Sequence, residues 1–324
     1  GTSITQGAME RLHQEAVLVG FVGEGGAPLV MSSYCDNSQP SPYLLPWVQI
    51  WTNPERSLAA ALSFQETRLW CLENLAEKIV PAFDYDQIGG LCDRYRRRLN
   101  SAGSLSALTA AETDFTKALH SELAVRWGMR GFVRAPRERH AMTSSSDQRA
   151  DFVNWAIDQG ERLTTSVASL ALWISGIPDS MSVARRPDQS GGLAQDLTSA
   201  FKDAFLLPLA FSLASRMDTA SASVETKFIS RLVDLLNNGW DDQHRKSRDL
   251  NSNSLSGKGS DGNLPHIRLG DSTVLEAASE HRAINIAITA IRDAIDKSGL
   301  IPPDNPPDQE ADPTIEPTQP ATGS

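Results

Sequence analysis

Residues 53–81, NPERSLAAALSFQETRLWCLENLAEKIVP, contain the pattern that decides the fold of this 324-residue chain. Asn53, Pro54 and Glu55 form a helix start, because they combine an N-cap side chain, a proline at the first helical position and an acid that suits the positive end of the helix dipole. Apolar residues then recur at helical spacing, at Leu58, Leu62, Leu69, Leu72, Leu75 and Ile79. Pro81 ends the run. The stretch therefore predicts a long helix with one buried face.

Apolar residues recur with the same helical period in most of the remaining chain. A helix is expected from about Gln87 to Leu99, and another in SLSALTAAETDFTKALHSELAVRW, residues 104–127, where Gly128 provides a C-terminal stop. Further helices are expected after the serine-rich cap 144–146, after Gly191 and Gly192 with a kink or break at Pro208, over 224–236, and after the capping-box sequence 273–276.

Residues 16–33, AVLVGFVGEGGAPLVMSS, are the one stretch with a strand pattern. Two apolar runs flank EGG, which favours a β-hairpin. A phosphate-binding loop is disfavoured, because the third glycine of GxGxxG would fall at Pro28 and no GK[ST] follows. The sequence thus predicts a mainly α protein, a multi-helix globular body of about seven helices with a small N-terminal β-hairpin and a disordered C-terminal tail.

Composition divides the chain into an N-terminal segment with the hairpin (1–52), a helical body (53–245), a flexible linker (246–271), a C-terminal helix (272–298) and an acidic, proline-rich tail (299–324). The linker contains LNSNSLSGKGSDGN, whose serine, asparagine and glycine residues are typical of flexible connections. The tail has seven prolines, five acids and no basic residue over 301–324. We expect it to be disordered, because it has too little apolar surface to bury.

The chain lacks the marks of export or membrane insertion. Its longest apolar stretch, AFLLPLAFSLA at 204–214, is shorter than the roughly 20 residues that span a bilayer, and the polar N-terminus has no signal-peptide pattern. Cys35, Cys71 and Cys92 form no CxxC motif, which favours a reducing compartment. We expect an intracellular, cytoplasmic protein, or one within an assembled particle, with no membrane partner.

Motifs of catalysis and metal binding are incomplete. His120-Ser-Glu122 matches half of a zinc-deaminase signature without its PCxxC half, and Ser199-Ala-Phe-Lys202 has SxxK spacing without the partner motifs. Asp84-Tyr-Asp86 fits a surface turn better than a calcium loop, which would need an acid where Tyr95 stands. The sequence therefore predicts no catalytic residue, no metal site and no cofactor, although an active site assembled from scattered residues would not be visible.

The middle of the chain is basic in an otherwise acidic protein. Eleven basic residues face five acids between Arg94 and Arg149, which gives this segment a charge of +6, and the remainder −16, within a total of −10. Such asymmetry is typical of a polyanion site, and the interleaved aromatic residues Tyr95, Trp127 and Phe132 are suited to stacking on bases. The candidate nucleic-acid-binding residues are Arg94, Arg96, Arg97, Arg98, Arg126, Arg130, Arg134, Arg137, Arg139, Trp127 and Phe132.

Other interpretations of these arginines stay open. Arg126 suits the negative end of its helix dipole, and the 94–98 cluster is within reach of Asp86 or Asp93, so internal ion pairing is an alternative. An acidic partner protein, such as the tail of a neighbouring copy, is another. The excess of arginine over lysine, 23 to 7, is also typical of a GC-rich coding genome.

Trp47 and Trp51 stand four residues apart between prolines in PYLLPWVQIWTNPER. Tryptophans in such a setting are usually core or interface anchors. We expect both to be buried, against the 54–80 helix or against a neighbouring subunit.

The combination of a basic middle, an acidic tail and missing catalytic motifs favours a non-enzymatic, self-assembling structural protein of capsid or nucleocapsid type. It would form a homo-oligomer or larger assembly and contact RNA or DNA through its arginine-rich middle. An intracellular helical adaptor or regulator that binds a protein partner is the alternative. An enzyme with a non-local site is the third interpretation.

Overall fold

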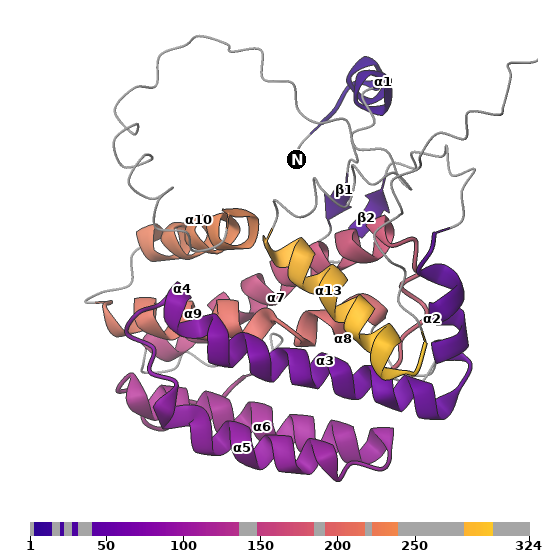
Figure 1. Ribbon diagram of the computed structural model, residues 1–324. Helices are drawn as coiled ribbons and strands as arrows, with labels where there is room; N and C mark the ends of the chain where they lie inside the picture. The colour runs from indigo at the N-terminus through magenta and orange to yellow at the C-terminus, as the bar shows by residue number, and fades with distance from the viewer. Residues whose placement is uncertain are drawn as a thin grey trace, which may run out of the picture.

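The computed structural model describes residues 3–14, 20–22, 28–31, 41–135, 148–184, 192–217, 222–238 and 282–300 (Figure 1). Within these residues the chain forms eleven helices and two short strands, which confirms the predicted mainly α class. The elements are α1 (Gln6–Gln14), β1 (Gly20–Val22), β2 (Pro28–Met31), α2 (Leu44–Trp51), α3 (Pro54–Asn74), α4 (Ala76–Ile79), α5 (Asp86–Asn100), α6 (Leu105–Arg126), α7 (Gln148–Ile174), α8 (Leu193–Ser199), α9 (Lys202–Ser215), α10 (Ala222–Asn238) and α13 (Arg282–Lys297).

The central helix α3 begins as its sequence predicts. The Asn53 side-chain oxygen accepts hydrogen bonds from the backbone N–H groups of Glu55 (3.0 Å) and Arg56 (3.1 Å), so the helix end is capped. The predicted single helix to Ile79 is instead divided at Leu75 into α3 and α4. Leu75 and Ile79 remain buried, which explains why periodicity alone does not reveal the break.

Several helix boundaries fall at residues that cap or end a helix. Helix α2, in contrast, was not predicted. Ser104 caps α6 by accepting a hydrogen bond from Ala107 N (3.2 Å), and Gly128 follows the helix with φ 72°. Helix α2 contains Pro46, but within its first turn, where a proline interrupts no helical hydrogen bond. Helix α9 continues through Pro208, and the expected break falls earlier, between α8 and α9.

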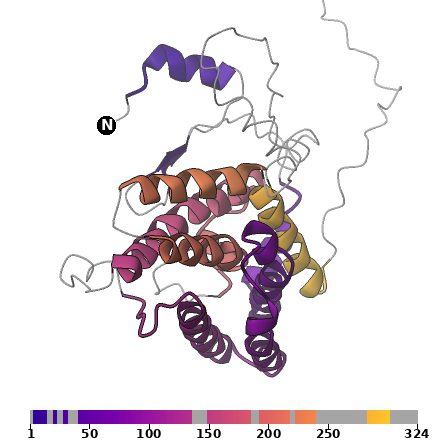
Figure 2. The ribbon, with the colours of Figure 1, turned by 90° about the vertical axis from the view of Figure 1, so that its left-hand side faces the viewer.

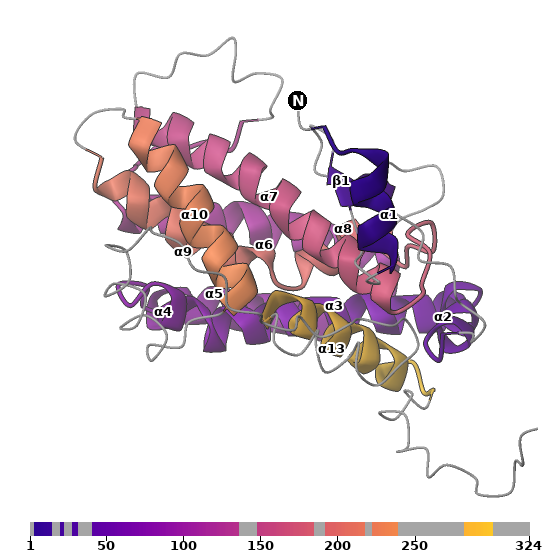
Figure 3. The same cartoon turned by 90° about the horizontal axis from the view of Figure 1, so that it is seen from above.

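The helices pack around α3, with other helices on several sides of it. Helices α5 and α6 form an antiparallel pair below α3 in Figure 1, while α7 and α9 pack against each other and α13 contacts both α3 and α7. The quarter-turn views in Figures 2 and 3 show α10 on the side of the body opposite to α5. Strands β1 and β2 pair antiparallel, with Phe21 opposite Val30, within the predicted hairpin region.

The crossing of α7 and α9 depends on a glycine. A Cβ atom on Gly160 would lie 2.4 Å from Leu206 Cδ2, and Leu206 is itself fully buried. A glycine at this point therefore lets the two helices approach closely.

Tryptophan burial differs between the two predicted anchors. Trp47 is fully buried, stacks on Phe64 at 6.2 Å between ring centroids and donates a hydrogen bond from Nε1 to Met181 O (3.1 Å). Trp51 is 43% exposed, so the expectation of burial is wrong for this residue within the chain. The two positions are one helical turn apart, but Trp47 lies within α2, whereas Trp51 is its last residue.

No single helix among the described residues is long and apolar enough to cross a membrane. Helices α8 and α9 would reach that length only as a pair bent by 59°. Residues of α9 are mostly buried within the helical body, as expected for a core helix. The predicted division of the chain into domains stays a prediction, and the linker 246–271, the capping box 273–276 and the tail 301–324 lie outside the described residues.

Candidate functional site

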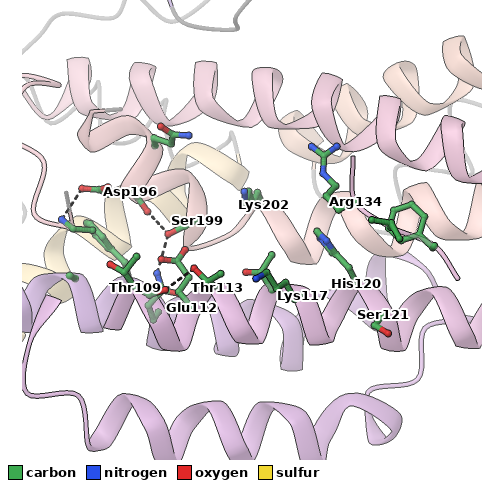
Figure 4. Close-up of a pocket in the computed structure, with 18 residues that line it drawn as sticks. Thr109, Glu112, Thr113, Lys117, His120, Ser121, Arg134, Asp196, Ser199 and Lys202 are labelled. Carbon is green, nitrogen blue, oxygen red and sulfur yellow. Dashed lines mark hydrogen bonds between the residues drawn. The ribbon is translucent and has the colours of Figure 1, made fainter. Parts of the chain in front are cut away.

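A pocket of about 700 Å³ lies between α6 on one side and the α8–α9 region with residues 132–134 on the other (Figure 4). Helix α6 supplies its polar face, on which Thr109, Glu112, Thr113, Thr116, Lys117, His120 and Ser121 recur at helical spacing. An adjacent face of α6 bears the apolar stripe that the sequence predicts, including Leu108, Phe115 and Leu119. One amphipathic helix thus anchors itself in the core and presents polar side chains to the pocket.

A buried ion pair lies beneath this pocket. Arg68 on α3 donates from Nε to Asp203 Oδ2 on α9 (2.8 Å), and its Nη2 donates to the same oxygen and to Thr116 Oγ1 (2.8 Å). Its Nη1 lies 3.7 Å from Glu112 Oε1. Burial favours the protonated form of Asp203, but Arg68 and Lys202 hold the pKa of this carboxyl below its usual range. The pair therefore stays ionised and joins α3, α6 and α9.

Polar and aromatic contacts extend this network to α5 and α8. Tyr95 stacks on Phe115 with ring centroids 4.2 Å apart and donates from its hydroxyl to Gln65 Oε1 (2.8 Å). The Gln65 amide in turn donates to Ser199 Oγ (3.2 Å) at the pocket wall. Because Phe115 also lies under the Arg68 guanidinium, at 4.9 Å, the ion pair is enclosed on its apolar side.

Three cationic side chains line the pocket. Lys117 is exposed on α6, Lys202 donates to Glu161 Oε1 (2.6 Å) on α7, and Arg134 pairs with Asp158 on the same helix. Lys202 and Arg134 keep 23% and 27% of their side chains exposed. The acids of α7 thus hold these two cations in place, and each retains surface toward solvent.

His120 lines the same pocket in its neutral form. Burial lowers the pKa of His120 to about 4, and Lys202, Arg134 and Arg68 lower it as well, while Asp203 acts in the opposite direction. At neutral pH this imidazole can donate or accept a hydrogen bond but adds no positive charge.

Asp196 on α8 joins the pocket wall to the loop before it. Its Oδ2 accepts hydrogen bonds from Ser182 Oγ (2.6 Å), Val183 N (3.0 Å) and Ala184 N (3.1 Å). Such a concentration of donors on one oxygen fixes the carboxylate and the loop together.

Of the eleven predicted nucleic-acid-binding residues, Arg134 and Phe132 line this pocket. Arg96 pairs with Glu73 and Asp93, Arg98 with Asp114 (2.8 Å), and Arg126 donates to Ala82 O (2.7 Å). The remaining described candidates, Arg94, Arg97 and Arg130, are exposed, Trp127 is half-buried, and Arg137 and Arg139 lie outside the described residues.

The described arginines of this set lie on α5, at the end of α6 and in the segment that follows it, and four of them are engaged in ion pairs or backbone hydrogen bonds. Nucleic-acid contact by the predicted set stays a prediction. The Asp84–Asp86 segment forms a turn before α5, where Asp84 Oδ1 accepts from Asp86 N (3.1 Å).

The fold resembles two solved structures, a CAS1 protein and a casposase. A CAS1 protein from Thermotoga maritima superposes with a TM-score of 0.51 over 79% of this chain and 85% of its own, at 14% identity. A casposase bound to integration product gives a TM-score of 0.53 over 85% of this chain and 83% of its own, also at 14% identity. At this identity the likeness concerns the fold alone.

Sequence comparison goes further, although no protein-family model matches the chain. It is 30% identical over 230 residues to the CRISPR-associated endonuclease Cas1 of Pectobacterium atrosepticum, covering 66% of this chain and 68% of that protein. The Cas1 of Pseudomonas aeruginosa is 33% identical over 236 residues, covering 67% and 69%. This chain belongs to the Cas1 family of CRISPR-associated endonucleases.

Family membership overturns the predicted capsid or nucleocapsid function. The relatives are endonucleases, not structural proteins of a particle, so the non-enzymatic packaging interpretation is wrong. The prediction relied on the lack of local catalytic motifs. The pocket residues form no such motif because they come from α6, α8, α9 and the 132–134 segment, which are far apart in sequence. The signal available in the sequence was the row of polar residues on α6 beside its apolar stripe, although the same pattern is typical of a solvated helix face.

Proposed function

We propose that this chain acts on DNA as a Cas1-family protein and that the pocket between α6 and α8–α9 receives the phosphodiester backbone. The observation behind this site is that Lys117, Arg134 and Lys202 line one cavity in a chain whose relatives are named as endonucleases. Ammonium and guanidinium groups are the side chains that most often contact phosphate oxygens.

The pocket also suits binding of the sugar-phosphate backbone without recognition of the bases. Ser121 presents an exposed hydroxyl at the pocket, which can donate to phosphate and sugar oxygens. Phe132 lies at the wall, where it packs edge-on against Phe211 at 5.5 Å and so has a fixed orientation. These contacts favour binding that depends weakly on base sequence.

The proposed assembly, nucleic acid and location of the chain do not rest on the pocket. Assembly into a homo-oligomer or larger complex, and DNA in place of RNA as the nucleic acid, follow from the family and not from the pocket. A cytoplasmic location stays an expectation, and the assembled-particle option falls with the capsid interpretation.

Charge reversal at Lys117 tests the proposed site. Lys117 is exposed, so Lys117→Glu should fold normally while weakening binding of fluorescently labelled DNA at low salt, because it removes one phosphate contact and adds a repulsive charge. Lys227→Glu makes the same charge change at an exposed position of α10, away from the pocket, and should bind nearly as wild type does. Equal affinities of the two variants would reject this pocket as the DNA site.

A further inference from the structure

The family name raises the question of whether this pocket can hold a divalent metal ion. Nucleases commonly cleave phosphodiester bonds with one or two metal ions that stabilise the attacking and leaving oxygens. Such ions are held by several oxygen or nitrogen ligands, each about 2.0–2.6 Å from the metal. The pocket must supply several such ligands if it is to hold a metal ion.

The pocket offers two carboxylates, Glu112 and Asp196, and each already contacts other groups through one of its oxygens. Asp196 Oδ2 already accepts three hydrogen bonds from the 182–184 loop. Glu112 lies 3.7 Å from the Arg68 guanidinium, whose charge opposes a second cation nearby. Asp203 is turned toward Arg68 beneath the pocket and is fully buried.

The neutral imidazole of His120 is too far away to complete a site with Glu112. The two residues are eight positions apart on α6, which corresponds to about 12 Å along the helix axis. The other polar groups that line the pocket are hydroxyls, the amides of Gln65 and Gln195 and three cations, none of which replaces a carboxylate as a ligand for such an ion. In the described part of the chain, no three His, Cys, Asp or Glu side chains come together as a metal site would require.

The cations of the pocket point to a different mode of binding. Lys117, Arg134 and Lys202 line the same pocket as the two carboxylates, so a divalent ion would enter beside three cationic groups, two of which are paired with acids of α7. The same three charges attract a phosphate group without any metal.

We propose that this pocket engages DNA phosphates directly through Lys117, Arg134 and Lys202, without a carboxylate-held divalent metal ion. This inference rests on the proposed function and makes the chain a DNA-binding member of its family whose binding is independent of Mg²⁺ and Mn²⁺. No cleavage step through a metal is supported by the residues of this pocket.

Two measurements on the full chain test the inference. Labelled-DNA anisotropy in EDTA and in MgCl2 at matched ionic strength should give dissociation constants that agree within about twofold, or ~0.4 kcal/mol. A Mn²⁺ titration followed by electron paramagnetic resonance should show no stoichiometric binding that depends on Glu112.

Metal binding at the pocket would overturn the inference. The inference would be wrong if the wild-type protein bound Mn²⁺, or if Mg²⁺ raised its DNA affinity tenfold or more, and if that effect was lost in Glu112→Gln but kept in Glu122→Gln. Glu122 is an exposed acid on the same helix that does not line the pocket, so it is the matched control. Absence of DNA binding under every condition would instead reject the proposed function, while the Mn²⁺ titration would still decide the metal question.

Discussion

Arg68→Met tests the buried ion pair that joins α3, α6 and α9 beneath the pocket. Methionine retains most of the packing on Phe115 but removes every hydrogen bond to Asp203. Asp203 then stays buried without its main counter-charge, and breaking a buried pair in this way costs about 3–5 kcal/mol. Because domains unfold with only about 5–15 kcal/mol, the variant should lose a large share of its stability.

Urea unfolding followed by far-UV circular dichroism measures this loss. Arg96→Met is the matched control, since Arg96 is 43% exposed in its pair with Glu73 and should cost less than about 1 kcal/mol. Arg68→Met/Asp203→Leu should recover most of the stability, because replacing a whole buried pair with apolar residues is often neutral. A loss in Arg68→Met no larger than in Arg96→Met would refute the assignment of this pair as a main contributor to stability.

The same variant has a predicted pH dependence. In the wild type the pKa of Asp203 is held below its unfolded value, so the pair stabilises the fold at neutral pH and this contribution is lost as the pH falls through the folded pKa. In Arg68→Met, burial without the guanidinium raises the pKa of Asp203, so its penalty grows as the pH rises. The difference in stability between the two proteins should therefore shrink toward acidic pH, and a constant difference would contradict this explanation.

Three further predictions concern packing and the pocket. Gly160→Val should lower the free energy of unfolding by about 1–3 kcal/mol, because its side chain would overlap Leu206, and an unchanged urea midpoint would contradict the close α7–α9 crossing. In a comparison of each variant with the wild type, Trp51→Phe should remove fluorescence that acrylamide quenches readily, whereas Trp47→Phe should remove fluorescence that acrylamide hardly quenches. Equal quenching of the two indoles would contradict their different burial. Ala184→His/Ser199→Asp adds two ligands beside Asp196 and should create Mn²⁺ binding detectable by paramagnetic resonance that the wild type lacks; unchanged Mn²⁺ behaviour would mean that more than ligand type is missing.

The features that sequence predicts here are those set by neighbouring residues. The Asn53 cap and the stop at Gly128 depend on a few adjacent positions, and each is found in the structure. The division at Leu75 was not predictable, because buried residues continue in phase across it. The exposure of Trp51, at the end of α2, likewise depends on how α2 packs in the folded chain, and no local pattern shows that.

The candidate site was even less predictable from neighbouring residues. The charge count between Arg94 and Arg149 treated arginines and acids as separate groups, whereas folding pairs Arg98 with Asp114 inside that segment and Arg134 with Asp158 outside it. The basic excess is therefore partly neutralised. The pocket itself appears only when α6 meets α8 and α9, and partners such as Glu161 for Lys202 and Asp158 for Arg134 lie on a distant element.

The salt dependence of DNA binding tests the central claim most directly, because each neutralised phosphate releases condensed counterions. Three engaged cations predict that log K falls with log[NaCl] with a slope of about −2 to −3, and that Lys117→Gln reduces the slope by about one contact. The Lys227→Gln control should leave the slope unchanged. A wild-type protein whose DNA affinity ignores salt, or a Lys117→Gln variant with the wild-type slope, would contradict phosphate binding in this pocket.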